Sequence, residues 1–340
     1  MAGRVYINDD NGLREIVDGK KRQLEKKEAH ILSLRVWLST TSGEKRNLMR
    51  ALGEGAEKEG FEVDYCLENH TEVPPKDYNF IFAYKSDGVS SPTHNLREKV
   101  VAASSGNQVF FLDSNVLKYY EKDIRYFRIP YRSIHPDNAD YMARDGEAFK
   151  KVDQIKKDLG IELKPMRTNG DHILLVLNRG FGGFSAFGKG CYEWAKETVE
   201  ELRKHTQRPI LIRSHNHAKI TAELAEDKKN LDYILKTYDN IKHTAFGESD
   251  LVENLKNAWA CVCYTSTSGA VALIEGIPLF TTHQACFSKM YSSGQLEDIE
   301  NPKEVNREKF LVDYATAHWN LDEMKDGTFW RKFKKYYIKK

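Results

Sequence analysis

The stretch WACVCYTSTSGAVALIEGIPLFT, residues 259–281, decides the fold of this chain. Residues 259–264 form a short apolar run that suits a buried parallel strand. Residues 265–269 are small hydroxyl residues ending in glycine, residues 270–275 continue as a helix, and Gly276 caps it before Pro278 opens the next strand. Such a loop can hold an anion, because unpaired backbone N–H groups and the helix dipole converge there. The alternative is an ordinary turn that binds nothing.

Length and charge indicate a globular protein of two domains. The chain has 340 residues, enough for two domains of ordinary size, and 40% of them are hydrophobic. Its 52 basic side chains are balanced by 50 acidic ones, so the chain as a whole is not a polycation. The five cysteines show no paired zinc spacing and are interpreted as reduced core thiols of a cytoplasmic protein. The start MAGRVYINDDNG lacks the apolar core of a signal peptide, and no apolar run approaches the roughly 20 residues of a membrane-spanning helix.

Strand and helix patterns alternate in the first part of the chain. A charge-rich segment at 1–29 is interpreted as a solvated arm or a surface helix. Strands are then predicted at 30–38, 61–66, 78–85 and 107–114, with helices at 41–60 and 95–106. A tract with several prolines, 126–172, breaks this rhythm and holds one helix, at 145–159.

A second alternating series follows. Strands are predicted at 172–180, 208–215, 241–246 and 259–264, and helices at 191–205, 230–238, 249–259 (with Ser249 as N-cap), 307–321 and 328–340. Strands separated by helices of this length imply parallel sheets. We therefore predict an α/β protein with two Rossmann-like domains facing a cleft. The predicted parts are an N-terminal arm (1–29), an N-terminal domain (30–164), a C-terminal domain (165–318) and a C-terminal crossing helix (319–340).

Four polar loops of the second series each follow a strand, at 178–189, 213–217, 246–249 and 265–269. The carboxyl ends of parallel strands meet at one edge, where open α/β sheets bind ligands. Gly182 and Gly183 would let the backbone approach a phosphate or a sugar, and Arg179, Arg213 and His215 would supply donors for a diphosphate. His215 and His217 could also bind a metal, but no clear third ligand accompanies them.

Strand, Ser/Thr-rich loop, small-residue helix, the sequence Glu-Gly-Ile-Pro at 275–278 and a short strand together resemble the donor-site signature of GT-B glycosyltransferases. The resemblance implies that the C-terminal half binds a nucleotide sugar, taken to be a UDP-sugar, with no tightly bound cofactor or metal. It implies that phosphate is contacted by Ser266, Thr267, Ser268 and Gly269, and the ribose by Glu275.

Three further stretches carry resemblances. Residues 213–215 are similar to a basic motif of capsule-type glycosyltransferases, although Asn216 stands where that motif has proline. Residues 318–330 resemble the segment that crosses back to the first domain in the GT-B fold. Residues 165–335 resemble uncharacterised proteins of tailed phages.

An inverting enzyme of this class would need a base from the N-terminal half. The candidates follow predicted strands or lie near them, and are Asp113, Asp87 and His135. Clusters of basic residues could track a phosphate backbone, the candidates being Arg128, Arg132, Arg331, Lys334 and Lys335. With the phage resemblance, they favour a hydroxymethylated pyrimidine in double-stranded DNA as acceptor, flipped out of the stack. Solvated helix faces are the alternative interpretation of these clusters.

Other functions fit the same sequence. The acceptor could be a surface polysaccharide or a lipid-linked glycan. A nucleotide-sugar 2-epimerase would share the architecture, and a non-catalytic nucleotide-binding or DNA-binding protein would share the donor loop.

Overall fold

The structure of the chain is a computed structural model. It describes residues 5–9, 12–17, 20–23, 31–40, 42–69, 72–73, 76–82, 92–104, 108–133, 139, 147–178, 189–215, 222–245 and 247–338. Residues 1–32 and residues 33–340 are separate units, and each is described by itself.

The N-terminal unit contains three short strands in place of the expected arm or surface helix. They are β1 (Val5–Asp9), β2 (Gly12–Val17) and β3 (Lys20–Gln23), paired antiparallel in that order. Val5 and Ile7 alternate with polar residues, which is a strand pattern that the dense charge of the segment conceals.

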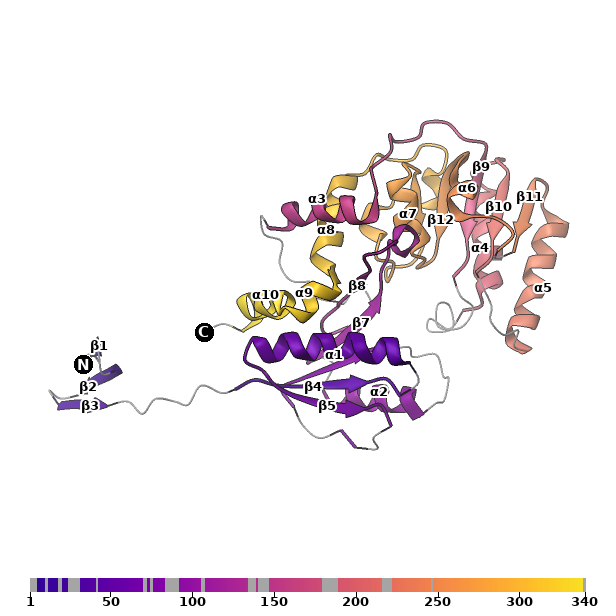
Figure 1. The fold of residues 1–340 in the computed structure, drawn as a ribbon. Helices are drawn as coiled ribbons and strands as arrows, with labels where there is room; N and C mark the ends of the chain where they lie inside the picture. Colours follow the sequence, from indigo (N-terminus) through magenta and orange to yellow (C-terminus); the bar gives the residue numbers. More distant parts are fainter. Residues whose placement is uncertain are drawn as a thin grey trace. The chain divides into compact units, whose positions relative to one another are not determined.

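The first sheet of the larger unit carries the predicted alternation (Figure 1). Its parallel strands are β4 (Ser33–Leu38), β5 (Glu62–Leu67), β6 (Tyr78–Phe82) and β7 (Val109–Ser114), in the order β5-β4-β6-β7. Helix α1 (Gly43–Lys58) follows β4, and α2 (Pro92–Ala103) follows β6. Ser42 caps α1 by accepting a hydrogen bond from the backbone N–H of Lys45. These elements confirm the strand and helix pattern predicted for the first half.

Two antiparallel strands complete this sheet, and both were missed in the sequence. Strand β8 (Tyr126–Arg128) pairs with β7, and β14 (His318–Asn320) pairs with β8. Residues 126–128 therefore belong to the first sheet and not to a linker, and the predicted helix 307–321 ends at residue 317. Three-residue strands next to prolines and charges carry too little pattern to be found by periodicity.

The C-terminal segment returns to the first sheet. Helices α9 (Leu321–Lys325) and α10 (Thr328–Tyr337) lie beside α1 (Figure 1). The indole N–H of Trp330 donates to the carbonyl of Leu52 at 2.7 Å, and the rings of Phe333 and Phe110 lie 4.8 Å apart. Burial of such side chains stabilises the fold by about 2–3 kcal/mol each. The aromatic face of α10 is therefore part of the core.

The second sheet has five parallel strands in the order β11-β10-β9-β12-β13. The strands are β9 (His172–Val176), β10 (Ile210–Arg213), β11 (Ile241–Thr244), β12 (Ala258–Cys263) and β13 (Leu279–Thr281). The order reverses between β9 and β12, the first and fourth strands, as in a doubly wound Rossmann-type sheet. This confirms the parallel sheet predicted for the second half.

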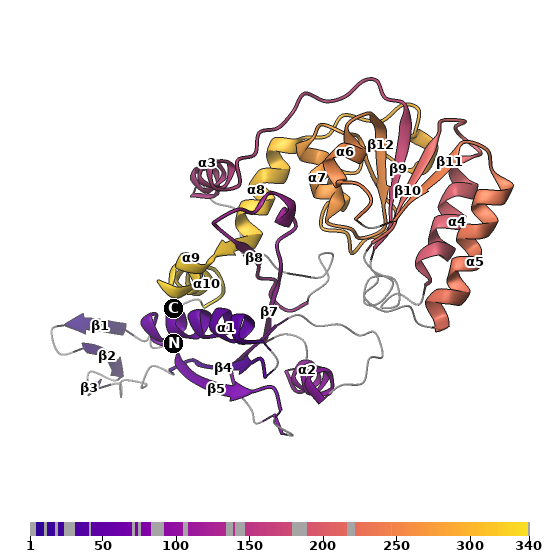
Figure 2. The same ribbon diagram turned by 45° about the vertical axis from the view of Figure 1, so that its right-hand side comes forward.

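Helices cover both faces of this sheet (Figure 2). On one face lie α4 (Cys191–Leu202) and α5 (Ala222–Thr237); on the other lie α6 (Leu251–Leu255) and α7 (Ser268–Ile274), with α3 (Glu147–Leu159) and α8 (Arg307–Ala317). Short 3₁₀ turns, η4 (Lys289–Tyr291) and η5 (Leu296–Asp298), follow β13. Helix α5 starts well before the predicted residue 230, and α6 is capped by Asp250, not by Ser249.

The two sheets are joined by one hydrophobic core. Val116, Leu117 and Tyr126, from the segment between β7 and β8 and from β8 itself, belong to the same buried cluster as residues of α3, α7, α8 and the second sheet. A predicted cleft between the sheets stays a prediction.

Candidate functional site

The carboxyl ends of β9, β10, β11 and β12 bring the polar loops of the second half to one edge of the sheet. At the point where the strand order reverses, the side chain of Asn178, after β9, donates to Oγ1 of Thr265, after β12, at 2.8 Å. The backbone N–H of Thr265 donates to Oδ1 of Asn178 at 3.3 Å. The two central strands are therefore tied together where doubly wound sheets bind their ligands.

The hydroxyl loop after β12 has unsatisfied donors. Oγ of Ser266 accepts from the N–H of Ser268 at 3.2 Å, and the carbonyl of Ser266 accepts from Gly269 at 3.2 Å. In the described part of the chain, the N–H groups of Ser266 and Thr267 have no hydrogen-bond partner. Thr267 is exposed and Ser266 is buried. Two consecutive free amides beside hydroxyls can bind a phosphate oxygen.

The floor of this loop is apolar. A Cβ on Gly269 would lie 3.2 Å from Sγ of Cys263, so glycine keeps the first turn of α7 close to β12. Cys261, Cys263 and Cys286 are buried in one cluster. Burial raises the pKa of Cys261 to about 12, which leaves that thiol protonated and unreactive at neutral pH.

The glycine-rich loop leads to a helix whose N-terminal donors are already occupied. The N–H groups of Tyr192 and Glu193 donate to Oδ2 and Oδ1 of Asp227, on α5, both at 2.8 Å. The N–H of Gly190 donates to the Glu193 carboxylate at 3.1 Å. A Cβ on Gly190 would lie 2.5 Å from Oδ1 of Asp227. An internal carboxylate thus fills the position where a phosphate would bind at this helix.

Arg213 and its neighbours form a polar cluster at the end of β10. Its guanidinium donates to Oδ1 of Asn254 at 3.0 Å and to the carbonyl of Ser249 at 3.1 Å, and burial lowers its pKa. Asp250, next to this cluster, accepts a hydrogen bond from the hydroxyl of Tyr119 at 2.6 Å. His215 is half-buried at the end of the same loop.

A hydrogen-bonded chain lies behind Arg213. Oγ of Ser214 is 2.7 Å from Nε2 of His243 and 3.0 Å from the hydroxyl of Tyr192. Burial lowers the pKa of His243, so the imidazole is neutral near pH 7 while its Nε2 shares a hydrogen bond with the Ser214 hydroxyl. This chain fixes the backbone between Arg213 and His215.

A fifth loop, after β13, was not predicted as part of the site. The ring of His283 lies 4.6 Å from that of Tyr264, at the end of β12, and the indole N–H of Trp194 donates to Oγ1 of Thr282 at 2.9 Å. The signal in the sequence was the polar run Thr-Thr-His-Gln immediately after the apolar strand.

Glu275 lies at the other end of α7 from the hydroxyl loop. Helix α7 has seven residues and is therefore about 10 Å long at the rise of an α-helix. Its carboxylate accepts from the hydroxyl of Tyr120 at 2.8 Å and pairs with Lys164. Gly276 has φ of 74°, and a Cβ there would lie 2.2 Å from the carbonyl oxygen of Pro165. The structure therefore does not bring Glu275 together with Ser266–Gly269.

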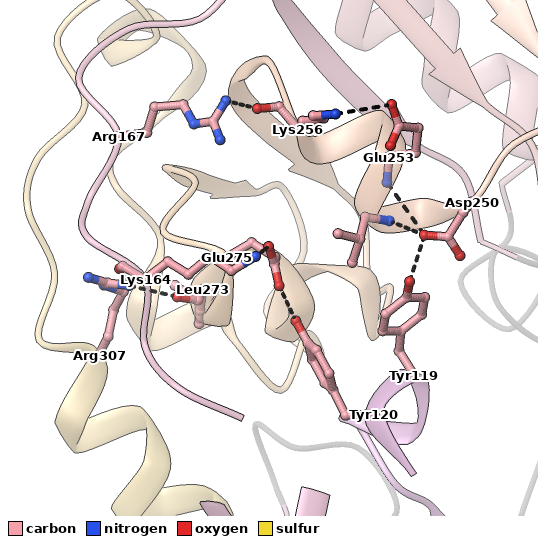
Figure 3. A network of polar contacts seen from close by, with 11 residues as sticks. Tyr119, Tyr120, Lys164, Arg167, Asp250, Glu253, Lys256, Leu273, Glu275 and Arg307 are labelled. Carbon is pink, nitrogen blue, oxygen red and sulfur yellow. Dashed lines mark hydrogen bonds and ion pairs between the residues drawn. The ribbon is translucent and has the colours of Figure 1, made fainter. Parts of the chain in front are cut away.

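The sequence Glu-Gly-Ile-Pro instead anchors the segment before β9. The N–H groups of Lys164 and Arg167 donate to the carbonyls of Ile274 and Gly276, at 3.0 and 2.8 Å. Arg307 donates to the carbonyl of Leu273 at 3.0 Å (Figure 3). The carbonyls at the end of α7 are thereby satisfied.

Most of the residues predicted for catalysis or DNA contact that the structure describes have internal partners. Asp113 pairs with Arg128, which is buried. Arg331 pairs with Glu59 at 2.7 Å, and Lys334 donates to the carbonyl of Glu59 at 2.6 Å. The other two predicted cations lie over tyrosine rings: Arg132 over Tyr131 and Lys335 over Tyr336.

Five of the predicted site residues lie outside the described residues: Asp87, His135, Arg179, Gly182 and Gly183. Among the residues that the structure does describe, no group of three or more His, Cys, Asp or Glu side chains is arranged to hold a metal ion. In the same residues, every helix is too short or too polar to cross a membrane.

Comparisons with known proteins give only distant likenesses. No protein family model matches the chain, and no curated protein matches it.

Among solved structures, the chain is similar to KpsC of Thermosulfurimonas dismutans, a β-Kdo 2,7 transferase, with 14% identity over 89% of this chain and 99% of that one, and a TM-score of 0.49. The KpsC β-Kdo 2,4 transferase of the same organism gives 12% identity over 85% and 91%, and a TM-score of 0.48. The UDP-GlcNAc 2-epimerase of Methanocaldococcus jannaschii gives 12% over 89% and 100%, and a TM-score of 0.30. Two of these three structures are glycosyltransferases, and all three are too distant to assign the chain to a family.

Proposed function

We propose that the chain is a glycosyltransferase that moves a sugar from a nucleotide-sugar donor to a hydroxyl acceptor. The observation that carries the proposal is the edge of the second sheet where the strand order reverses. There Asn178 and Thr265 tie β9 to β12, and the next N–H groups, those of Ser266 and Thr267, have no partner among the residues that the structure describes. In doubly wound sheets this is the place where a nucleotide binds.

The diphosphate of the donor is assigned to the hydroxyl loop and not to the N-terminus of α4. The Asp227 carboxylate already takes the N–H groups of Tyr192 and Glu193, and a phosphate there would meet a like charge. This arrangement disfavours a dinucleotide held in the usual way at the first strand–helix turn.

Transition-state stabilisation would come from donors aimed at the leaving diphosphate. The described groups that qualify are these two amides and the hydroxyls of Thr267 and Ser268. Arg213, whose guanidinium bonds Asn254 and Ser249, and Arg179 are the cations of the proposal. Glu275 is excluded from the ribose role in this proposal, because it lies at the far end of α7 and pairs with Lys164.

The base would come from the first sheet. Asp113 lies at the carboxyl end of β7 and is paired with Arg128, so it would have to leave this pair to accept a proton. Asp87 and His135 remain candidates of the proposal. Substitution of Asp113, Asp87 and His135 by alanine, one at a time, should identify the base. Loss of the base lowers kcat about a hundredfold or more and leaves donor affinity unchanged.

A carbohydrate hydroxyl is favoured over a base in DNA as acceptor. Arg128, Arg331 and Lys334 are directed into contacts within the protein, which weakens the argument for a bound phosphate backbone. The acceptor is tested by offering the protein hydroxymethylated DNA, a surface polysaccharide and a lipid-linked glycan in separate reactions.

The deciding experiment measures the melting temperature of the protein with UDP-, CMP-, GDP- and dTDP-sugars, because a ligand stabilises the state that it binds. One donor should raise the melting temperature of the protein and of the Asp232→Ala control, which changes an exposed aspartate of α5. The Thr267→Ala variant should respond less. If no nucleotide sugar raises the melting temperature, the proposal is wrong.

Turnover then separates the classes of function. Donor consumption that requires an acceptor supports the transferase. Donor isomerisation without an acceptor would indicate a 2-epimerase, and donor binding without turnover a non-catalytic protein.

A further inference from the structure

A groove of about 620 Å³ lies between α1, the segment 123–127 and residues 320–325. Its floor is apolar, with Leu48, Ala51 and Phe127 buried. At its sides lie Ile124 and Leu321, whose side chains are 38% and 43% exposed. Large apolar side chains exposed around one hollow indicate a place that binds something.

The polar groups of the groove are mixed in type. Asn47, Arg50, Asp123 and Asp322 are exposed along it. Among the described residues, the side chains of Arg50, Asp123 and Asp322 make no hydrogen bond or ion pair. The carboxylates can only accept hydrogen bonds, the guanidinium can only donate, and the amide of Asn47 can do both.

The other charges of the groove are neutralised by one another. Arg125 pairs with Glu44, and its guanidinium lies 5.3 Å from the centre of the Phe127 ring. Lys325 lies 3.8 Å from the carboxylate of Glu54. The groups left for a ligand are two carboxylates and one guanidinium, so the groove is slightly acidic.

This lining selects among ligand classes. A polyanion would place its phosphates against two unpaired carboxylates, which costs electrostatic energy. A purely apolar chain would bury three charges without partners. A chain of neutral sugars has hydroxyls that donate and accept and C–H faces that pack on an apolar floor. We infer that this groove binds a neutral glycan and holds the acceptor chain of the transfer; this inference rests on the proposed function.

One segment of the chain reaches from the groove to helices α6 and α7, which cover the second sheet. The segment that joins β7 to β8 forms one wall of the groove through Asp123 and Ile124. A few residues earlier it carries Tyr119 and Tyr120, whose hydroxyls donate to Asp250 and Glu275. A glycan in the groove would therefore contact the segment that reaches the donor-binding half.

The test uses the full chain and a panel of neutral linear oligosaccharides of glucose, galactose, mannose and N-acetylglucosamine. Binding is measured by calorimetry and by saturation-transfer NMR. At least one oligosaccharide should bind, and the Asp123→Ala/Asp322→Ala double variant should bind it about tenfold more weakly, a loss of about 1.4 kcal/mol. Asp232→Ala, the exposed carboxylate on α5, should bind it as the unchanged protein does. Arg50→Ala is a second groove variant, expected to weaken binding in the same way.

Two outcomes overturn the inference: no oligosaccharide of the panel binds, or the double variant and Arg50→Ala both bind as tightly as the unchanged protein. A short DNA duplex that competes for the groove would also overturn it, in favour of a polyanion. Donor-induced melting shifts are measured on the same proteins. They separate a failed groove, in which the donor still binds, from a failed proposed function, in which the donor does not.

Discussion

The starts of α4 and α7, the helices that follow β9 and β12 on either side of the reversal of strand order, differ in a way that the sequences before them do not suggest. The glycine-rich turn looks like the phosphate loop, but the N–H groups of α4 are taken by Asp227. The hydroxyl-rich turn is shorter, and the described structure leaves the amides of Ser266 and Thr267 without partners. The two helix starts therefore differ in which backbone donors are still free after folding, and the glycine content of the preceding loops does not show this difference.

The largest expected effect on stability comes from freeing the N–H groups at the start of α4, so that they resemble those at the start of α7. Asp227→Ala should lower the free energy of unfolding by about 2 kcal/mol, because two N–H groups of α4 lose a charged acceptor. Urea denaturation measures this loss, with Asp232→Ala as the matched control on the same helix. Millimolar pyrophosphate should restore part of the stability in Asp227→Ala more than in the control. Equal responses would mean that the freed amides of α4 do not bind anions.

Making the second turn resemble the first is the reverse experiment. Thr267 has φ of −63°, which proline also adopts, so Thr267→Pro removes the free N–H without a change in this angle. Donor affinity should fall about tenfold, or about 1.4 kcal/mol. Thr267→Ala, which removes only the hydroxyl, should lose less. Calorimetric titration with the donor measures both, and a proline variant with unchanged affinity would contradict the role given to the amide.

The bridge between the two turns should have a smaller effect. Asn178→Ala removes the hydrogen bonds at 2.8 and 3.3 Å that join β9 to β12. The free energy of unfolding should fall by about 1 kcal/mol, and donor affinity should fall with it. Asn178→Asp, which keeps one acceptor, is the control. A stability loss with full donor affinity would show that the two turns act independently.

The smallest expected effect is a pH dependence of the unfolding free energy, which comes from His243 beside Ser214. Burial lowers the pKa of His243 in the folded protein, so below the unfolded pKa of about 6.5 the unfolded chain binds more protons than the folded one. The stability that His243 contributes is therefore present above that pH and is lost as the pH falls through the folded pKa. His172 and His318 shift in the same direction. The measurement is thus the difference between the unchanged protein and His243→Gln in unfolding free energy, from about pH 7 down to about pH 5. A constant difference would refute it.

The alternation of strands and helices could be predicted because long apolar runs and helix periods are local signals. Strand β8 could not, because its pairing with β14 joins Arg128 to His318, and three residues hold no period. The basic helix at the C-terminus was predicted to contact DNA from its charges. Its orientation depends on Phe110 and Leu52, which the local pattern does not contain.

The candidate site was predictable where it is contiguous and not where it is assembled by folding. The hydroxyl loop lies within one stretch of sequence. Asp227 reaches Tyr192 from a different helix, and only tertiary packing brings the two together. Glu275 was given to the ribose because the sequence does not show to which end of a short helix a ligand binds. The seven residues of α7 are few in the sequence, but they span about 10 Å along the helix axis.

Strand β14 has a consequence for how the chain is made. Residues 318–320 form the edge strand of the first sheet, beside β8, and α10 then packs on its aromatic residues. During synthesis the first half of the chain cannot be completed when it leaves the ribosome, since its last strand and its covering helix are still to come. Until then β8 is an open edge that other chains can pair with. The first sheet is therefore completed only after residues 318–337 have been made, and loss of these residues would leave the first sheet prone to aggregation.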